Sequence, residues 1–403
     1  MKVLVINCGS SSLKYQVLDM TTESDLCSGV VERIGIEGGF IKHKFNGEKT
    51  KIEQELTNHN DAIALVVKTL TEGETKVLES LDEIDVIGHR VVHGGEVYNE
   101  SIIIDENVKA KVKELFDLAP LHNPANLMGI EACEKLMPGK KNVAVFDTAF
   151  HQTMPKASYI YSIPYEFYEK YGIRKYGFHG SSHRYIAGRT AEILEKPITE
   201  LNIVNCHLGN GASLCAIKEG VSVDTSMGFT PLEGLTMGTR AGDVDSSVIQ
   251  FLMDKEGMSI NEVMNILNKK SGILGISGVS SDCRDVEIAA ENGNELAQLA
   301  LDKLSYQVKR YLGAYMAVMD GVDAITFTGG IGEMGAEIRE AICANLEHLG
   351  IELDKDTNKK IRGKEAIIST PNSKIKVMVV PTNEELMIAR DSVELVKKLT
   401  IEN

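Results

Sequence analysis

The sequence lacks the features that mark disulfide-rich, zinc-binding or membrane-spanning proteins. Its seven cysteines are odd in number, widely scattered and without a C-x-x-C pair, which fits neither a disulfide framework nor a zinc site. The apolar N-terminal run of residues 1–6 is too short for the core of a signal peptide. No stretch approaches the roughly 20 apolar residues of a membrane span. We therefore expect a cytoplasmic protein in a reducing compartment, without a membrane partner.

Basic residues are outnumbered by acidic ones. The 43 lysines and arginines against 58 aspartates and glutamates give a net charge of −15 without a basic run along the chain, so we expect no nucleic-acid partner. Hydrophobic residues make up 43% and charged residues 25%, which excludes the disordered, collagen-like and coiled-coil classes. A length of 403 residues exceeds what one hydrophobic core usually serves and predicts two domains.

Proline is scarce, with nine residues, whereas the 36 glycines cluster. Such clusters mark places where the backbone turns tightly or approaches a ligand, although plain connecting loops account for part of them. The clusters lie at residues 209–211, 228–242, 272–278 and 329–335.

Short apolar, β-branched runs predict strands, and longer segments with helical periodicity predict helices. Continuous apolar strands that alternate with helices favour an α/β fold with buried sheets. The expected strands span residues 3–7, 14–18, 84–89, 143–147, 203–207, 215–218, 324–327 and 377–380. The expected helices span residues 62–70, 108–118, 183–194, 295–319, 336–349 and 385–399.

Two distant segments, residues 3–18 and 203–218, share one pattern: a strand, a turn of Gly, Ser or Asn, and a second strand. Each half of the chain then ends in a strand beside polar residues, Asp147 in the first half and residues 381–384 in the second. These parallels predict an internal duplication with one repeat per domain. We expect the boundary near residues 148–152.

The two turns are candidate phosphate-binding loops. Residues 7–14 offer free backbone N–H groups, three serine hydroxyls and Lys14, but lack the ending of a Walker A loop. A plain β-hairpin explains the same residues. At residues 207–211 the glycines would let a phosphate approach, with His207 and Asn210 as donors. An Asn-Gly type I′ turn is the alternative there.

Two further segments could line a nucleotide site. Residues 328–333 follow an apolar strand and precede a helix, without the G-x-G-x-x-G spacing of a dinucleotide fingerprint. A glycine-lined wall against an adenosine fits them better. Asp282-Cys283-Arg284 opens a helix after a Gly/Ser loop, and a helix cap with a trailing arginine is the alternative interpretation.

Several charged or polar side chains lie at predicted element ends or in loops. Arg90, His122, His179 and Arg240 are so placed, where arginine suits planar recognition of a carboxylate or phosphate; structural hydrogen bonds are the alternative. Asp147 ends an apolar strand, where an unpaired carboxylate is costly, so it should meet a cation or donors. Residues 383–385 predict either a helix cap with acidic residues on the dipole or a Mg²⁺ site.

The sequence closely resembles the acetate kinase family from end to end, within the superfamily of acetate and sugar kinases, heat-shock ATPases and actin. No motif position departs from the family pattern. The resemblance is carried by residues 7–14, 88–95, 120–124, 146–151, 176–183, 207–211, 237–243, 327–333 and 381–385.

The resemblance implies a homodimeric enzyme that interconverts ATP and acetate with ADP and acetyl phosphate, using Mg²⁺ or Mn²⁺ in its place. The implied fold is α/β, with two actin-like (ribonuclease-H-like) domains related by internal duplication and the active site in the interdomain cleft. Residues 1–149 would form the N-terminal domain, with the C-terminal helix 386–403 packing back on it. Residues 150–385 would form the nucleotide-binding domain.

Site roles also follow from the resemblance. Asn7 and Glu384 would bind the metal, Arg90 and His122 the acyl substrate, and Asp147, His179 and Arg240 would be catalytic, the last two in the transition state. Because acetate, with a pKa of roughly 4, is already ionised, we assign Asp147 to positioning or to the metal's surroundings. The implied ATP contacts are Lys14, His207, Leu208, Gly209, Asn210, Gly211, Asp282, Cys283, Arg284, Gly329, Gly330, Ile331, Gly332 and Glu333. The methyl pocket would comprise Val92, Leu121, Phe178 and Pro231.

Two alternatives stay open. One is a propionate or butyrate kinase of the same family. The other is a non-metabolic actin-like ATPase, which would share the two hairpin loops without needing Arg90, His122 and Arg240 to converge on a small acid.

Overall fold

The computed structural model describes residues 1–402, and its chain divides into two compact units. Unit 1 comprises Met1–Ala149 together with the chain from Asn383 onward, and unit 2 comprises Phe150–Thr382. The expected domains placed residues 383–385 with the second domain, whereas these residues belong to unit 1. The reason is local, because the Asn383 side chain accepts a hydrogen bond from the Leu386 N–H (3.0 Å) and so begins the last helix.

Unit 1 is built on a mixed eight-stranded sheet in the order β5-β4-β3-β2-β1-β6-β8-β7. β1, β6 and β8 run parallel, and the other neighbours pair antiparallel. The strands are β1 (Lys2–Cys8), β2 (Ser12–Asp19), β3 (Ser24–Glu32), β4 (Phe40–Phe45), β5 (Glu48–Glu53), β6 (Val86–Val91), β7 (Ile102–Ile103) and β8 (Lys141–Phe146).

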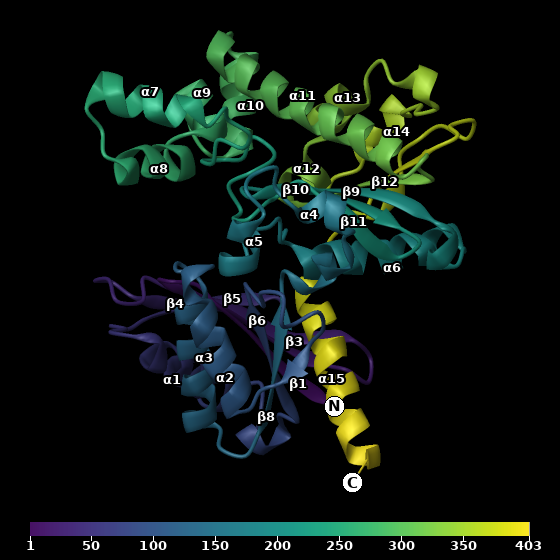
Figure 1. Ribbon diagram of the computed structural model, residues 1–403. Coiled ribbons are helices and arrows are strands. Elements are labelled where there is room, and N and C mark those ends of the chain that lie inside the picture. The colour runs from purple at the N-terminus through teal and green to yellow at the C-terminus, as the bar shows by residue number, and fades with distance from the viewer. Residues whose placement is uncertain (403) are drawn as a thin grey trace. The chain divides into compact units, whose positions relative to one another are not determined.

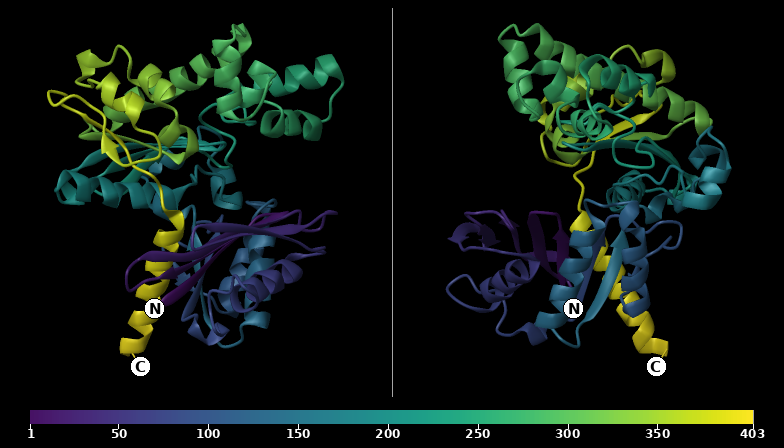
Figure 2. Two further views of the ribbon diagram at one scale, coloured as in Figure 1. Left: turned by 180° about the vertical axis from the view of Figure 1, so that it is seen from behind. Right: turned by 60° about the vertical axis from the view of Figure 1, so that its left-hand side comes forward.

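Helices cover both faces of this sheet (Figure 1). α1 (His59–Thr71) and α3 (Asn123–Leu136) enclose an apolar core with one face, and α2 (Glu106–Glu114) packs on α3. α15 (Glu384–Glu402) packs on β1, β6 and β8 and is visible beside the strands in both views of Figure 2. Gly88 makes this approach possible, because a Cβ there would lie 2.7 Å from Ile388 and from Ser392.

Unit 2 repeats the same topology on a six-stranded sheet in the order β11-β10-β9-β12-β14-β13. β9, β12 and β14 run parallel, while β10, β11 and β13 pair antiparallel with their neighbours. This matches β3-β2-β1-β6-β8-β7 strand for strand, as the predicted internal duplication requires. The strands are β9 (Asn202–Leu208), β10 (Ala212–Lys218), β11 (Val221–Thr225), β12 (Ala324–Thr328), β13 (Ala366–Ile367) and β14 (Lys376–Val379).

The helices of unit 2 also lie on both faces of its sheet (Figure 1). α6 (Gly180–Leu194) closes one apolar core, and α11 (Glu295–Val318) contacts β9 and β10 from the other face. Others extend the unit: α4 (Lys156–Tyr159), α5 (Glu166–Tyr171), α7 (Ser247–Glu256), α8 (Ile260–Lys269), α9 (Gly272–Ser277), α10 (Cys283–Glu291), α12 (Gly329–Met334), α13 (Ala336–Cys343) and α14 (Lys355–Lys360).

Two predicted helices were wrong in extent. The helix expected over residues 108–118 ends as α2 at Glu114 and is followed by a 3₁₀ turn over Leu115–Asp117. Residues 336–349 read as a single helix, but α13 ends at Cys343, and a separate 3₁₀ turn covers Glu347–Leu349. Ala344 is extended and Asn345 has a φ of 61°, a left-handed conformation that interrupts a helix. No helix among residues 1–402 is long and apolar enough to span a membrane.

Candidate functional site

The carboxyl ends of the parallel strands in unit 1 bring three predicted site residues together. Arg90 lies near the end of β6, Asn7 near the end of β1, and Asp147 directly follows β8. The Arg90 guanidinium donates from Nε to Asp147 Oδ1 (2.9 Å), pairs through Nη2 with Oδ2, and donates from Nη1 to Asn7 Oδ1 (3.2 Å). Asp147 is 1% exposed, and it meets the cation that its position demanded.

Glu384, the first residue of α15, is half-buried near this pair. Its pKa is raised from 4.5 to about 7, mainly by burial; the positive charge of Arg90 opposes the shift, and the negative charge of Asp147 adds to it. The helix cap is made by Asn383, so capping explains Asn383 but not the burial of Glu384. This carboxyl group accepts no hydrogen bond from any residue in the described range 1–402.

The residues expected to hold the acyl group are distributed over both units. In unit 1, His122 occupies the N-cap position of α3. Val92 is buried and its N–H binds Asn126 Oδ1 (3.0 Å), while Leu121 is 68% exposed. In unit 2, the carbonyl of buried Phe178 bonds to a histidine side chain, and the Pro231 carbonyl accepts from Arg240 Nη1 (2.7 Å).

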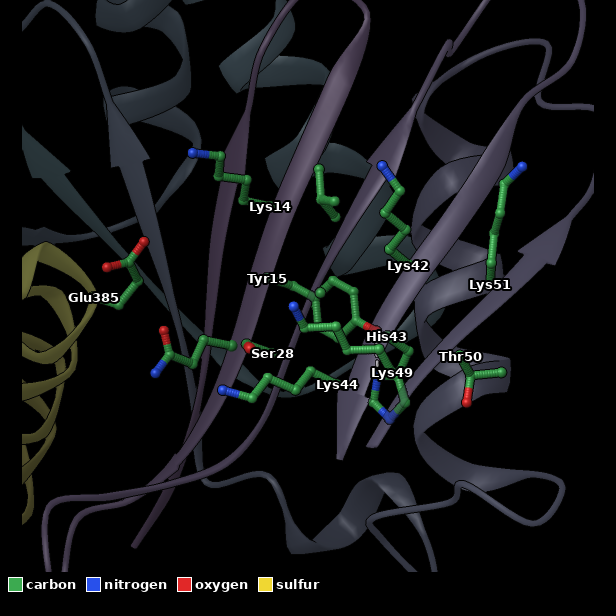
Figure 3. Close-up of a pocket in the computed structure, with 13 residues that line it drawn as sticks. Lys14, Tyr15, Ser28, Lys42, His43, Lys44, Lys49, Thr50, Lys51 and Glu385 are labelled. Atoms are coloured by element: carbon green, nitrogen blue, oxygen red, sulfur yellow. Dashed lines mark hydrogen bonds between the residues drawn. The ribbon is translucent and has the colours of Figure 1, made fainter. Parts of the chain in front are cut away.

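Lys14 lies on the exposed face of β2, in a cavity of about 620 Å³ that we call the lysine basin (Figure 3). Strand register aligns the cations, because Lys42 faces Lys51 and Lys44 faces Lys49 across β4 and β5. Glu385 of α15 lies on the Lys14 side of the basin (Figure 3). The basin therefore concentrates five lysines, Lys14, Lys42, Lys44, Lys49 and Lys51, on a chain that is acidic overall.

In unit 2, the loop of residues 209–211 joins β9 to β10. Neither Asn210 nor Gly211 has a positive φ, so the alternative of a type I′ turn is wrong, since that turn requires it at both residues. The loop is shaped by close neighbours. Gly238 donates to the Asn210 carbonyl (2.9 Å), and a Cβ on Gly238 would collide with the Asn210 side chain at 1.7 Å.

His179 and Arg240 meet beside this loop. A Cβ on Gly211 would lie 2.7 Å from Arg240 Nη2 and 3.6 Å from His179 Nε2, so only glycine leaves this space open. His179 has a left-handed φ of 57°, and its ring stacks on that of His207 with centroids 4.1 Å apart. Burial lowers the pKa of Arg240, and within residues 1–402 no carboxylate forms an ion pair with it. Arg240 is thus a half-buried cation that lacks an anion.

A cavity of about 540 Å³ in unit 2 unites the three segments expected to contact a nucleotide, a size suited to a small-molecule ligand. Asp282 caps α10 and also pairs with the Arg284 guanidinium (2.6 Å), so the predicted cap is present at the cavity wall. Burial raises the pKa of the Cys283 thiol to about 12, which leaves it unreactive. The predicted residues that line the cavity are Gly209, Asn210, Asp282, Cys283, Arg284, Gly330 and Ile331.

The remaining predicted residues of these segments lie outside the cavity lining. Leu208 and Gly332 are buried. Glu333 accepts from the N–H groups of Gly329 (2.9 Å) and Thr382 (3.2 Å), so its carboxylate holds the loop. Sequence reasoning missed other lining residues, of which only Met334 and Gly335 lay in a noted glycine cluster. These are Ser281, Glu287, Met334, Gly335 and Arg362.

The oxygen donors of unit 1 fit a divalent cation only in part. Among the described residues, no group of three or more His, Cys, Asp or Glu side chains could hold a metal alone. Mg²⁺, however, usually takes one or two protein carboxylates and completes its shell with water and substrate phosphates. Glu384 provides an oxygen donor whose ionised form is disfavoured by burial, and a nearby cation would favour that form. These residues therefore suit a Mg²⁺ ion that arrives with phosphate.

Comparisons with known proteins agree along the whole chain. The sequence profile of the acetokinase family matches residues 2–390. Acetate kinases of Caldicellulosiruptor bescii and Thermotoga maritima are 60% and 58% identical over 399 and 401 residues, covering 99% of this chain and 100% of each relative. The crystal structure of Porphyromonas gingivalis acetate kinase has 50% identity and a TM-score of 0.95, with 98% of this chain and 99% of that chain covered. A Francisella tularensis propionate kinase, with the same coverage, has 42% identity and a TM-score of 0.92.

Proposed function

The chain belongs to the acetokinase family, and from this premise we propose that it is an acetate kinase. It transfers the γ-phosphoryl group of ATP reversibly to acetate and forms acetyl phosphate and ADP. The observation that carries the proposal is Arg240, a half-buried cation without an anionic partner, beside His179 and an open glycine loop. A transferring phosphoryl group supplies the missing negative charge.

The reaction needs alignment and charge neutralisation more than proton transfer. Acetate is ionised at neutral pH, because its pKa is roughly 4. One carboxylate oxygen forms a bond to the γ-phosphorus as the bond from phosphorus to the β-γ bridging oxygen breaks, and ADP keeps that electron pair. No general base is required. The role of Asp147 is to orient Arg90.

Arg90 and His122 hold the acetate carboxylate. A guanidinium has five N–H donors, and Asp147 with Asn7 takes three of those of Arg90. Two donors are left for the substrate, in a plane fixed by the buried carboxylate. Val92, Leu121, Phe178 and Pro231 surround the acetate methyl group.

His179 and Arg240 stabilise the charge that develops on the equatorial oxygens of the phosphoryl group. ATP is bound by the loop of residues 207–211 and by segments 282–284 and 329–333, with Lys14 reaching its phosphates. The 540 Å³ cavity supports this assignment, because it already joins parts of all three segments. Asn7 and Glu384 would hold Mg²⁺, or Mn²⁺ in its place, which would supply positive charge to neutralise the phosphates when bound.

A homodimer in the cytoplasm and two actin-like domains, one in each compact unit, complete the proposal. Two alternatives predict different products. An actin-like ATPase would hydrolyse ATP without forming an acyl phosphate. A propionate or butyrate kinase would prefer a longer acid, and a solved propionate kinase shares this fold.

One experiment separates these possibilities. The purified protein is supplied with Mg²⁺, ATP and acetate, propionate or butyrate, and the acyl phosphate is trapped with hydroxylamine. We expect the highest kcat/KM with acetate and a loss of roughly 10–200-fold for an added methylene. A higher kcat/KM for propionate, or ATP hydrolysis without hydroxamate, would overturn the proposal.

A further inference from the structure

Ser213 of β10 lies between two imidazole rings in the core of unit 2. Its Oγ is 2.8 Å from His179 Nδ1 and 2.9 Å from His183 Nε2. Ser213 and His183 are fully buried, and His183 belongs to α6, which packs on this face of the sheet. One hydroxyl group therefore connects His179 to a second histidine that the proposed chemistry does not use.

The second nitrogen of His183 shows where the proton of this ring is carried. His183 Nδ1 is 2.8 Å from Asn205 Nδ2, and Thr326 Oγ1 donates to Asn205 Oδ1 (2.8 Å). With the amide reversed, the Thr326 hydroxyl proton would have no acceptor within residues 1–402, and an unpaired buried donor is costly. The amide nitrogen therefore faces His183 Nδ1 and donates to it.

His183 is neutral, because burial beside other histidines lowers its pKa well below 6.5. A neutral imidazole has one N–H. Since Nδ1 accepts from Asn205, the proton is on Nε2 and is donated to Ser213 Oγ. The Ser213 hydroxyl then gives its own proton to His179 Nδ1.

We propose that Thr326, Asn205, His183 and Ser213 form a directed hydrogen-bond chain that holds neutral His179 as the Nε2–H tautomer. Nε2 is the ring nitrogen on the side of Gly211 and Arg240, so the chain directs a donor toward the phosphoryl group. The reverse direction would present a lone pair to phosphate oxygens. The four are positioning residues, and their role rests on the proposed function.

If these four residues only supported the fold, they would not determine the tautomer of His179. The left-handed backbone and the stacking on His207 already hold the His179 ring. The hydrogen-bond chain adds control over which nitrogen bears the proton. The tautomer of His179 is therefore the quantity to measure.

The test uses the full-length protein with ¹⁵N-labelled histidine, and NMR reports the protonated nitrogen of each ring at a pH where His179 is neutral. His179→Gln assigns the resonance. In the wild type we expect a protonated Nε2 and an unprotonated Nδ1. Ser213→Ala should shift the population toward Nδ1–H and lower kcat by on the order of 10-fold or more, with the KM values for acetate and ATP unchanged. Ser213→Thr retains the hydroxyl and should preserve both.

Thr326→Val is the second variant, because it keeps the shape of the side chain and makes no hydrogen bond to His179. It should give a mixture of tautomers with a smaller loss of kcat. An Nδ1–H tautomer in the wild type, or an unchanged tautomer and kcat in Ser213→Ala, would overturn the inference. Failure of the proposed function would appear separately, as a wild type with the Nε2–H tautomer that forms no acetyl phosphate.

Discussion

Arg90 binds both carboxylate oxygens of Asp147 and also reaches Asn7, so one guanidinium connects the ends of three parallel strands. The carboxylate is almost completely buried, whereas the arginine side chain is 22% exposed. Solvent and ligands can therefore reach the ion pair only on the side of the arginine. This geometry makes Asp147 the support of Arg90.

Replacement of Asp147 by asparagine tests this support. Asp147→Asn keeps the shape but removes the charge, so Arg90 loses its orientation. We expect a raised KM for acetate and a lower melting temperature, because breaking a buried ion pair costs about 3–5 kcal/mol, and less where one partner is partly exposed. Initial rates and thermal unfolding measure both effects. A variant that loses only the acid limb of its kcat profile would instead mark Asp147 as a proton acceptor.

Glu384 should make the ligand-free protein less stable as the pH rises. Its pKa in the folded state, about 7, lies above the ordinary 4.5, so folding favours the protonated form. That contribution is complete below pH 4.5 and is lost as the pH approaches 7. Glu384→Gln should therefore become progressively more stable than the wild type across this range, by about 1.4 kcal/mol per pKa unit. Parallel stability curves for the two proteins would contradict this.

The same variant addresses the metal. Mg²⁺ with ADP should raise the melting temperature of the wild type above pH 7, where Glu384 is ionised. In Glu384→Gln this rise should be reduced and turnover should collapse while the fold stays intact. Near-normal kcat at saturating Mg²⁺ would exclude Glu384 as a metal ligand.

Replacement of Arg240 should lower the rate of catalysis without lowering the stability of the fold. Because no carboxylate pairs with this half-buried guanidinium, Arg240→Ala should leave the melting temperature unchanged or raise it. We expect kcat to fall by on the order of 10³-fold, as for other arginines of phosphoryl transfer. Steady-state rates and calorimetry measure the two effects, with Arg240→Lys as a matched control that keeps the charge. A clear loss of stability with normal kcat would assign Arg240 a structural role.

The sequence allowed four of the six strands of each repeat to be predicted, together with the pairing requirement of Asp147, because these follow from local apolar runs; the strands β3, β7, β11 and β13 were missed. It did not identify Arg90 as the partner, which lies 57 positions away and is brought near by the parallel pairing of β6 and β8. Ser213 showed no signal either, since a serine in an apolar strand is unremarkable until α6 places His183 above it. Contacts of this kind depend on register and packing, which periodicity does not encode.

The lysine basin also depends on strand register, and its like charges should lower the stability of the protein. Lys44 and Lys49 face each other across β4 and β5, and like charges in that position repel. Lys49→Gln should raise the melting temperature by roughly 1–3 °C at low salt and have little effect at 1 M salt, where screening is strong. Lys51→Gln is the matched control, because Lys51 already pairs with Glu53 (2.6 Å) and should gain less. Equal gains in both variants would indicate general charge reduction.

Acyl-chain selectivity tests the position of the acetate methyl group. Val92 is buried one residue beyond β6, two positions from Arg90, and its backbone is held by Asn126. Val92→Ala removes two methyl groups without disturbing that hydrogen bond, so it should make room for an extra carbon. A pocket that discriminates by one methylene contributes about 1–3 kcal/mol. The ratio of kcat/KM for propionate to that for acetate should therefore rise by roughly 10-fold or more. The ratio is the proper measure, because looser alignment would slow both acids equally.

Leu121→Ala is the comparison, and its 68% exposure predicts a smaller change. A flat ratio in both variants would place the methyl group elsewhere.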